Sequence, residues 1–103
     1  MRMLLKANIP TEAGNETIKT GELATKMKQI LDDLKPEAVY FAEDGGERTA
    51  YLVLDMATPS DLPRVAEPFF LAFNARVTAR PAMTLDDLVK AGPAIDRAVK
   101  NYA

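Results

Sequence analysis

The 103-residue sequence contains no cysteine, no histidine and no tryptophan. Without cysteine the chain has no disulfide, no thiolate nucleophile and no thiolate metal site. Without histidine it has no imidazole base, no histidine-ligated zinc or haem, and no Ser-His-Asp triad. Any catalysis would have to use carboxylate, lysine, tyrosine and arginine side chains. We therefore expect no cofactor, and whether the protein is an enzyme stays open at this point.

Long apolar runs and an excess of positive charge are also missing. Thirteen Lys and Arg residues stand against 15 Asp and Glu residues, a net charge of −2, which gives no basic field to hold nucleic acid. Lys6 interrupts the apolar start of the chain, so we do not expect a signal peptide. No stretch approaches the roughly 20 apolar residues of a membrane helix. We expect a cytoplasmic protein that binds neither nucleic acid nor membranes.

The remaining composition, 48% hydrophobic and 27% charged, is typical of one globular domain. Alternating apolar and polar residues predict four β-strands: Met1 to Ile9, Ala38 to Glu43, Arg48 to Met56 and Ala75 to Pro81. Between the second and third strands, Gly45-Gly46 indicates a tight hairpin turn, because glycine readily adopts positive φ.

Helical spacing of apolar residues predicts two main helices. The first runs from about Thr17 to Leu34, after a polar loop from Thr11 to Asn15. The second follows Ser60, a suitable N-cap, and closes at Asn74. Two short helices come last, one capped by Thr84 and one beginning at Gly92-Pro93.

The order of these elements, β-α-β-β-α-β plus a helical tail, predicts an α+β ferredoxin-like fold. We expect a single domain over residues 1–103, with a core of about 1–81 and a tail of about 84–103. Four strands would form one antiparallel sheet with both main helices on its apolar face. A chain of this length is expected to have a radius of gyration of about 13 Å.

The function is expected to depend on what covers the other face of the predicted sheet, because this face is neither apolar nor fully polar. Its expected residues are Arg2, Leu4, Lys6, Asn8, Thr49, Tyr51, Val53, Asp55, Arg76, Thr78 and Arg80, with either Tyr40 or Phe41. Such a face is too apolar to be fully solvated and too charged for an ordinary core. It can pack against its twin in a homodimer and leave a cleft between the two sheets.

The element order, the length and the stretch from Asp61 to Asn74 (DLPRVAEPFFLAFN) resemble small bacterial proteins of the dimeric α/β-barrel superfamily. The resemblance covers roughly residues 1–81 and concerns layout rather than a catalytic motif. It implies a homodimer with a pocket between the sheets. Members of that superfamily include muconolactone isomerases, cofactor-free monooxygenases, haem enzymes and ligand-sensing domains. Haem members that use a proximal histidine are excluded here, since the chain has no histidine.

Two groups on this face are candidate sites. Lys6, Arg76 and Arg80 could converge to hold the carboxylate or phosphate of a small ligand; the alternative is that they pair with nearby acids. Tyr51 and Asp55 could perform acid–base chemistry if burial shifted the pKa of the carboxyl group. The alternative there is a tyrosine packed at a subunit interface.

Three functions follow from these alternatives. The first is a homodimeric domain that binds a small anionic or aromatic metabolite through Lys6, Tyr51, Arg76 and Arg80. The second is a cofactor-free isomerase or monooxygenase whose acid or base is Asp55, Tyr51 or Lys6. The third is a purely structural dimer, for which Arg76 and Arg80 should each meet an acid. The helical tail could cover the sheet edge or cap the cleft. No acidic cluster has the spacing of a metal site.

Overall fold

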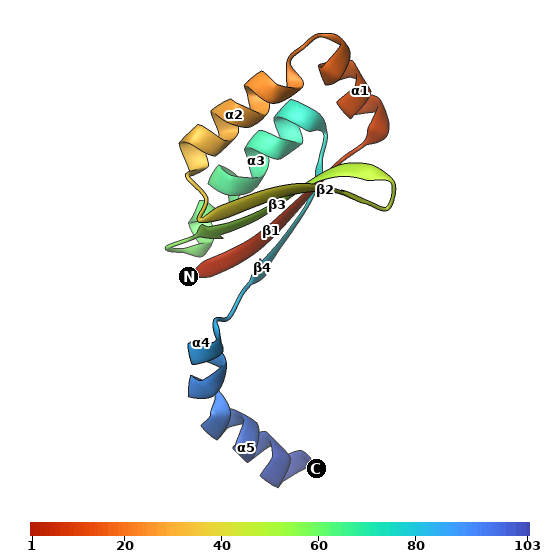
Figure 1. The fold of residues 1–103 in the computed structure, drawn as a ribbon. Helices are drawn as coiled ribbons and strands as arrows, with labels where there is room; N and C mark the ends of the chain where they lie inside the picture. Colours follow the sequence, from red (N-terminus) through yellow and green to blue (C-terminus); the bar gives the residue numbers. More distant parts are fainter.

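The computed structural model describes all 103 residues and contains four strands and five α-helices (Figure 1). In chain order these are β1 (Arg2–Ile9), α1 (Thr11–Lys19), α2 (Leu23–Leu34), β2 (Ala38–Asp44), β3 (Glu47–Asp55), the 3₁₀ turn η1 (Pro59–Asp61), α3 (Leu62–Phe73), β4 (Arg76–Pro81), α4 (Leu85–Lys90) and α5 (Gly92–Tyr102). The strands form one sheet in the order β2-β3-β1-β4, and every neighbouring pair is antiparallel. The predicted ferredoxin-like arrangement is confirmed at this level.

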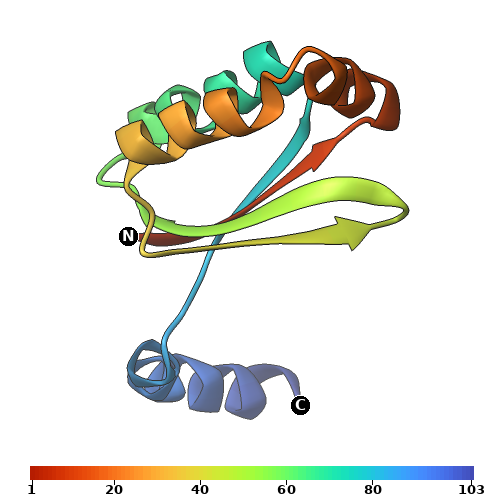
Figure 2. The same ribbon diagram turned by 45° about the horizontal axis from the view of Figure 1, so that its top comes forward.

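Helices α1, α2 and α3 cover one face of the sheet (Figure 2). The alternation along β1 and β3 places Leu5, Ala7 and Leu52 on that face, where none of them is accessible to solvent. Phe69 and Phe73 of α3, four residues apart on one side of the helix, are the largest fully buried side chains. The apolar face predicted from the two-residue period therefore forms the core.

The prediction of a polar loop from Thr11 to Asn15 is wrong, because these residues belong to α1. Gly14 suggested a loop, but it is buried inside the helix, and a Cβ added there would lie 3.3 Å from the side chain of Ile9. The glycine thus permits close packing of α1 on the sheet. The single helix predicted from Thr17 to Leu34 is divided, because Gly21 adopts a φ of +76° between α1 and α2.

The predicted hairpin is confirmed, with φ values of 63° at Gly45 and 80° at Gly46. Both strands reach the two glycines, so β2 ends at Asp44 and β3 begins at Glu47. The register resolves an ambiguity on β2. Tyr40 lies opposite Tyr51 on the uncovered face, whereas Phe41 lies opposite Ala50 on the helix face.

The ends of the second main helix are set by local hydrogen bonds. Ser60 was expected to be the N-cap, but Thr58 and Asp61 form the capping box around η1, and α3 begins at Leu62. The backbone hydrogen bonds that the Asp61 carboxylate accepts from Ala57 and Thr58 lower its pKa. Asn74 closes α3, as predicted, and it adopts the left-handed conformation.

The C-terminal residues 82–103, called the tail below, do not pack on the rest of the chain, called the body. Thr84 and Asp87 form the predicted capping box of α4, but neither α4 nor α5 contains a buried residue. The tail extends from β4 on the side of the sheet opposite α1–α3 (Figure 2). As a result the radius of gyration is 17.0 Å, larger than the length alone predicts. None of the helices combines the length and apolarity needed to cross a bilayer.

Candidate functional site

The sheet face that no helix covers is called the open face below. Every second residue of each strand points to it. Its members are Arg2, Leu4, Lys6 and Asn8 of β1, Ala38, Tyr40, Ala42 and Asp44 of β2, Glu47, Thr49, Tyr51, Val53 and Asp55 of β3, and Arg76, Thr78 and Arg80 of β4. Tyr40 is 74% exposed and Leu4 is 40% exposed, while Val53 beside Leu4 is half-buried. The open face thus presents apolar and aromatic side chains to solvent from three adjacent strands.

A cluster of three polar side chains occupies the open face at the hairpin. The carboxylate of Asp44 accepts a hydrogen bond from the Tyr51 hydroxyl at 2.7 Å, and the ammonium of Lys6 lies 2.7 Å from the same oxygen. These bonds, from Lys6 first and then Tyr51, hold the pKa of Asp44 below its ordinary value. The bond to Asp44, together with partial desolvation, raises the pKa of Tyr51. The cluster therefore combines a stabilised carboxylate with a phenol that keeps its proton.

Two further cations of the open face are already paired. The guanidinium of Arg76 forms an ion pair with Glu47 across the sheet. Arg2 forms a two-nitrogen contact with Glu37, just before β2, and this hydrogen-bonded pair raises the pKa of Arg2. Arg80 is exposed and has no ion pair within the chain. The anion-binding prediction therefore depends on Arg80, since the other cations have acidic partners.

The structure does not bring Asp55 and Tyr51 together. They are four residues apart on β3, about 13 Å along the strand. Asp55 lies at the end of the sheet, where its carboxylate is 81% exposed and is 2.8 Å from the N-terminal ammonium. Its solvated position lacks the enclosure that the predicted acid–base chemistry requires. Tyr51 and Lys6 meet at Asp44 instead, a residue that lay outside both predicted strands, next to the glycines of the turn.

The cluster predicts two opposite pH dependences. Because the pKa of Asp44 is lowered, its stabilising effect is present above its ordinary pKa of 3.8 and is lost as the pH falls through the lower folded value. Because the pKa of Tyr51 is raised, its effect is present below its ordinary pKa of 10.0 and is lost as the pH rises through the higher folded value.

We expect Asp44→Asn to lower the pKa of Tyr51 toward 10.0, because the substitution removes the negative charge beside the phenol. The measurement is an ultraviolet titration of tyrosinate in a background of Tyr40→Phe and Tyr102→Phe, which leaves Tyr51 as the only tyrosine. Asp55→Asn is the matched control and should leave the titration unchanged. An identical titration with and without the Asp44 carboxylate would show that the hydrogen bond does not form in solution.

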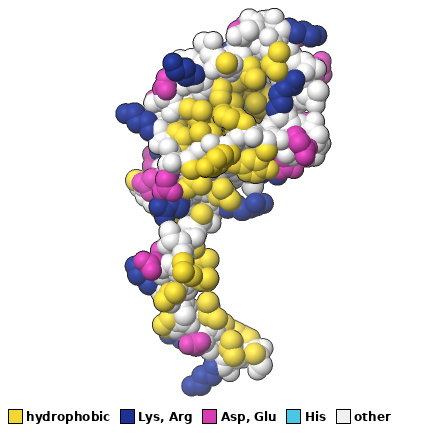
Figure 3. Space-filling view, viewed as in Figure 1, with side chains coloured by type: hydrophobic (Ala, Val, Ile, Leu, Met, Phe, Trp, Pro, Cys, Tyr) yellow, Lys and Arg dark blue, Asp and Glu magenta, His cyan; other side chains and the backbone are white.

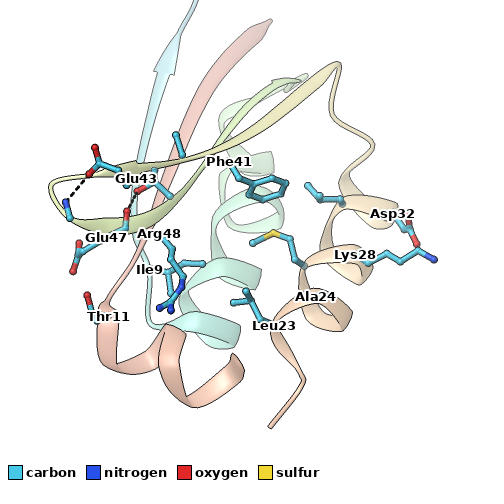
Figure 4. Close-up of a pocket in the computed structure, with 15 residues that line it drawn as sticks. Ile9, Thr11, Leu23, Ala24, Lys28, Asp32, Phe41, Glu43, Glu47 and Arg48 are labelled. Atoms are coloured by element: carbon cyan, nitrogen blue, oxygen red, sulfur yellow. Dashed lines mark hydrogen bonds between the residues drawn. The ribbon is translucent and has the colours of Figure 1, made fainter. Parts of the chain in front are cut away.

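A groove of about 910 Å³ lies on the other side of the sheet, between α2 and the hairpin of β2 and β3. Leu23, Ala24, Met27 and Leu31 of α2 form one wall, and Phe41 of β2 faces them. In Figure 4 the ring of Phe41 points across the groove toward α2. Phe41 is 58% exposed, so its apolar surface has no cover in the single chain. The sequence analysis did not identify this groove, because it could not assign Phe41 to a face.

Charged side chains surround the groove. Lys28 and Asp32 stand on α2, and Glu43 and Arg48 stand on the hairpin (Figure 4). Arg48 donates a hydrogen bond to the side chain of Asn15, but none of the four groove residues forms an ion pair within the chain. No group of three acidic side chains in the molecule is arranged to hold a metal ion.

Comparison with known proteins assigns no family to the chain. No protein-family model matches the sequence, and none of the curated proteins compared with it is a match. The chain is similar to a solved structure of a de novo designed protein, Ferredog-Diesel, with a TM-score of 0.46 and 7% sequence identity. The similarity covers 79% of this chain and 85% of the designed chain.

Proposed function

We propose that this protein is a self-associating domain in which the open face packs on the open face of a second copy. The observation that carries the proposal is the exposed apolar surface of Leu4 on the internal strand β1 and of Tyr40 on the edge strand β2, in a sheet whose other face carries the hydrophobic core. Antiparallel sheets commonly bury one face, and two sheets stack about 10 Å apart. The product would be a dimeric α/β barrel.

The charges of the open face favour a twin over a strongly charged partner. Lys6 is neutralised by Asp44 and Arg76 by Glu47, so both signs are balanced within one chain. Paired charges can be covered without leaving an isolated ion in a low-dielectric interface. A partner of one predominant sign would gain little from such a face. A second copy brings the same apolar side chains and the same largely neutralised surface, on which Arg80 is the one cation without an acidic partner.

Pairing would also enclose the Lys6–Asp44–Tyr51 cluster and Arg80. Binding of an anionic or aromatic metabolite in that enclosed space stays a prediction, and so does acid–base chemistry by Tyr51 or Lys6. Neither is needed for the self-association proposed here.

We expect Leu4→Lys to weaken dimerisation by at least about tenfold, because the new ammonium would lie at the centre of the interface. Leu4 is paired with Arg80 on the neighbouring strand, so the added charge also faces a like charge. Leu71→Lys, at an 82% exposed leucine of α3, is the matched control and should have no effect. Dissociation constants come from sedimentation equilibrium. Equal constants for Leu4→Lys and the control would contradict the proposal.

A further inference from the structure

The tail exposes an apolar surface that its own body does not cover. Ile95, Val99 and Tyr102 follow one another at helical spacing along α5 and are 49%, 59% and 88% exposed. Leu85 and Val89 of α4 are 76% and 68% exposed. Beyond Ala82, whose backbone N–H donates to the Arg2 carbonyl, the hydrogen bonds of the tail stay within the tail. The tail is thus an amphipathic arm without a partner in the single chain.

Helices of this length do not hold their conformation in water on their own. Isolated helices shorter than about 12–15 residues are marginal, and most helical stability comes from packing an apolar side. Helix α4 has 6 residues and α5 has 11. The arm therefore needs a surface to pack on.

The groove between α2 and β2 is the apolar surface that the open-face dimer leaves uncovered, because it lies on the helix side of the sheet. The tail of the same chain is poorly placed to fill this groove. The tail leaves the sheet from β4, whereas the groove adjoins β2 at the opposite edge of the strand order β2-β3-β1-β4. To reach it, the tail would have to cross the open face and turn around the far edge.

A second copy has no such difficulty. Figure 3 shows that hydrophobic side chains on the body near α2 and β2 and others along the tail are visible from the same direction. A two-fold rotation about an axis between body and tail, parallel to the open face, turns the second copy over. It places the two open faces opposite each other and brings each tail to the side of the other body that carries the groove. Such an interface is isologous, so the same contact occurs twice.

We infer that the tail of each copy docks in the α2–β2 groove of the other, with Ile95 and Val99 of α5 against Phe41 and the apolar wall of α2. The inference rests on the proposed open-face dimer. It describes an exchanged amphipathic helix in an apolar groove, a recurrent mode of recognition in which residues three and four apart act as anchors.

The area of the interface supports a contribution from the tail. Four strands of about eight residues form a face of about 19 by 26 Å, or about 500 Å² per copy. Two such faces give about 1,000 Å², the lower limit for a specific interface, whereas stable interfaces bury about 1,200–2,000 Å². The open face alone is therefore marginal, and two docked tails would bring the interface into the usual range.

The charges of the two surfaces are also compatible. The polar side of α5 carries Asp96, Arg97 and Lys100, and none of them forms an ion pair within the chain. The groove presents Lys28 and Asp32 on α2, which are likewise unpaired. Both signs are available on both sides, so a docked helix can find opposite charges at the rim without burying them.

The test mixes two full-length variants that damage opposite halves of the contact. Phe41→Ser removes the groove's aromatic wall, and the double variant Ile95→Ser with Val99→Ser removes the anchors of the tail. These three side chains are about half exposed, so the body should fold in both variants, which circular dichroism verifies. Leu71→Ser is the control for loss of an exposed apolar side chain. Dissociation constants are measured by sedimentation for each variant and for an equimolar mixture.

In each variant homodimer both tail contacts are damaged, whereas the mixed dimer keeps one intact contact. Damage to one half is expected to abolish a contact, so a second defect in the same contact adds nothing. If each variant then weakens dimerisation by about 100-fold through the loss of two contacts, the mixed dimer should be weakened by only about tenfold. Leu71→Ser should match the wild type. A wild-type dimer whose affinity neither variant changes would overturn the docking and leave open-face pairing intact. Weakened variants without recovery in the mixture would also overturn it, and a wild-type monomer would overturn both proposals.

Discussion

Replacing Phe69 with alanine is expected to lower the free energy of unfolding by about 3–5 kcal/mol, because truncating a buried phenylalanine removes apolar contacts and leaves a cavity. Phe69 lies on α3 in the core cluster that holds the helices against the sheet, and none of its surface is accessible. Since domains of this size are stable by only about 5–15 kcal/mol, much of the total would be lost. Chemical denaturation at fixed protein concentration measures the change, which keeps the effect of self-association constant.

The next residue in the chain provides the matched control. Phe70 is 41% exposed on the same helix, so Phe70→Ala is expected to cost about 1 kcal/mol or less. Equal losses for Phe69→Ala and Phe70→Ala would mean that α3 does not present Phe69 to the core as described. The positions of β1 and β3 that carry the open face would then be in doubt as well.

Thr49→Val is expected to lower the free energy of unfolding by about 1–3 kcal/mol, because it removes the acceptor of a buried hydrogen bond. Asn8 donates its side-chain amide to the Thr49 hydroxyl at 2.9 Å, and the two residues are only 7% and 2% exposed. They join β1 to β3 near the hairpin end of the open face. With valine at position 49 the amide of Asn8 would lose its partner while it stays buried.

A double-mutant cycle separates this effect from a simple change of shape. Asn8→Leu combined with Thr49→Val replaces both polar groups, so the double variant should be more stable than the sum of the single losses predicts. Thr78→Val is the control and should change stability little, because this half-buried open-face threonine makes no side-chain hydrogen bond. Strictly additive losses in the cycle would show that the Asn8–Thr49 bond does not carry the effect.

Sequence patterns were sufficient for most of the body because its elements follow from local rules. Strand alternation identified the face that contains Leu5 and Leu52, and the pair Gly45-Gly46 located the hairpin. The error over residues 11–15 arose because Gly14 was treated as a loop former. Its role is steric: it lets α1 approach Ile9, and that contact depends on tertiary packing.

The candidate site was predicted less well, since it depends on which side chains reach one another. The analysis placed Lys6 and Tyr51 on one face, but it missed their shared partner Asp44, which looked like turn chemistry. One signal in the sequence could have identified Asp44: it is an acidic residue at the end of a strand, directly before a two-glycine turn. The sequence did not determine which face of the sheet carries Phe41, because a shift of one residue in strand pairing moves every side chain of the strand to the opposite face.

The largest difference between the predicted and the observed structure concerns the tail. A compact domain was expected, whereas the chain measures 58 Å along its longest axis because α4 and α5 project from β4. Local capping by Thr84 was correctly predicted, but capping does not determine where a helix docks. In our account the missing contacts lie in the second copy, where the open face and the groove each meet their counterpart.

Native mass spectrometry of the wild-type protein tests the central claim, self-association, most directly. Our account predicts a species of twice the 11.3 kDa chain mass that persists under gentle conditions. A constant additional mass on that species would identify a ligand held between the sheets. Detection of the single chain alone, across concentrations at which the protein stays folded, would contradict the account.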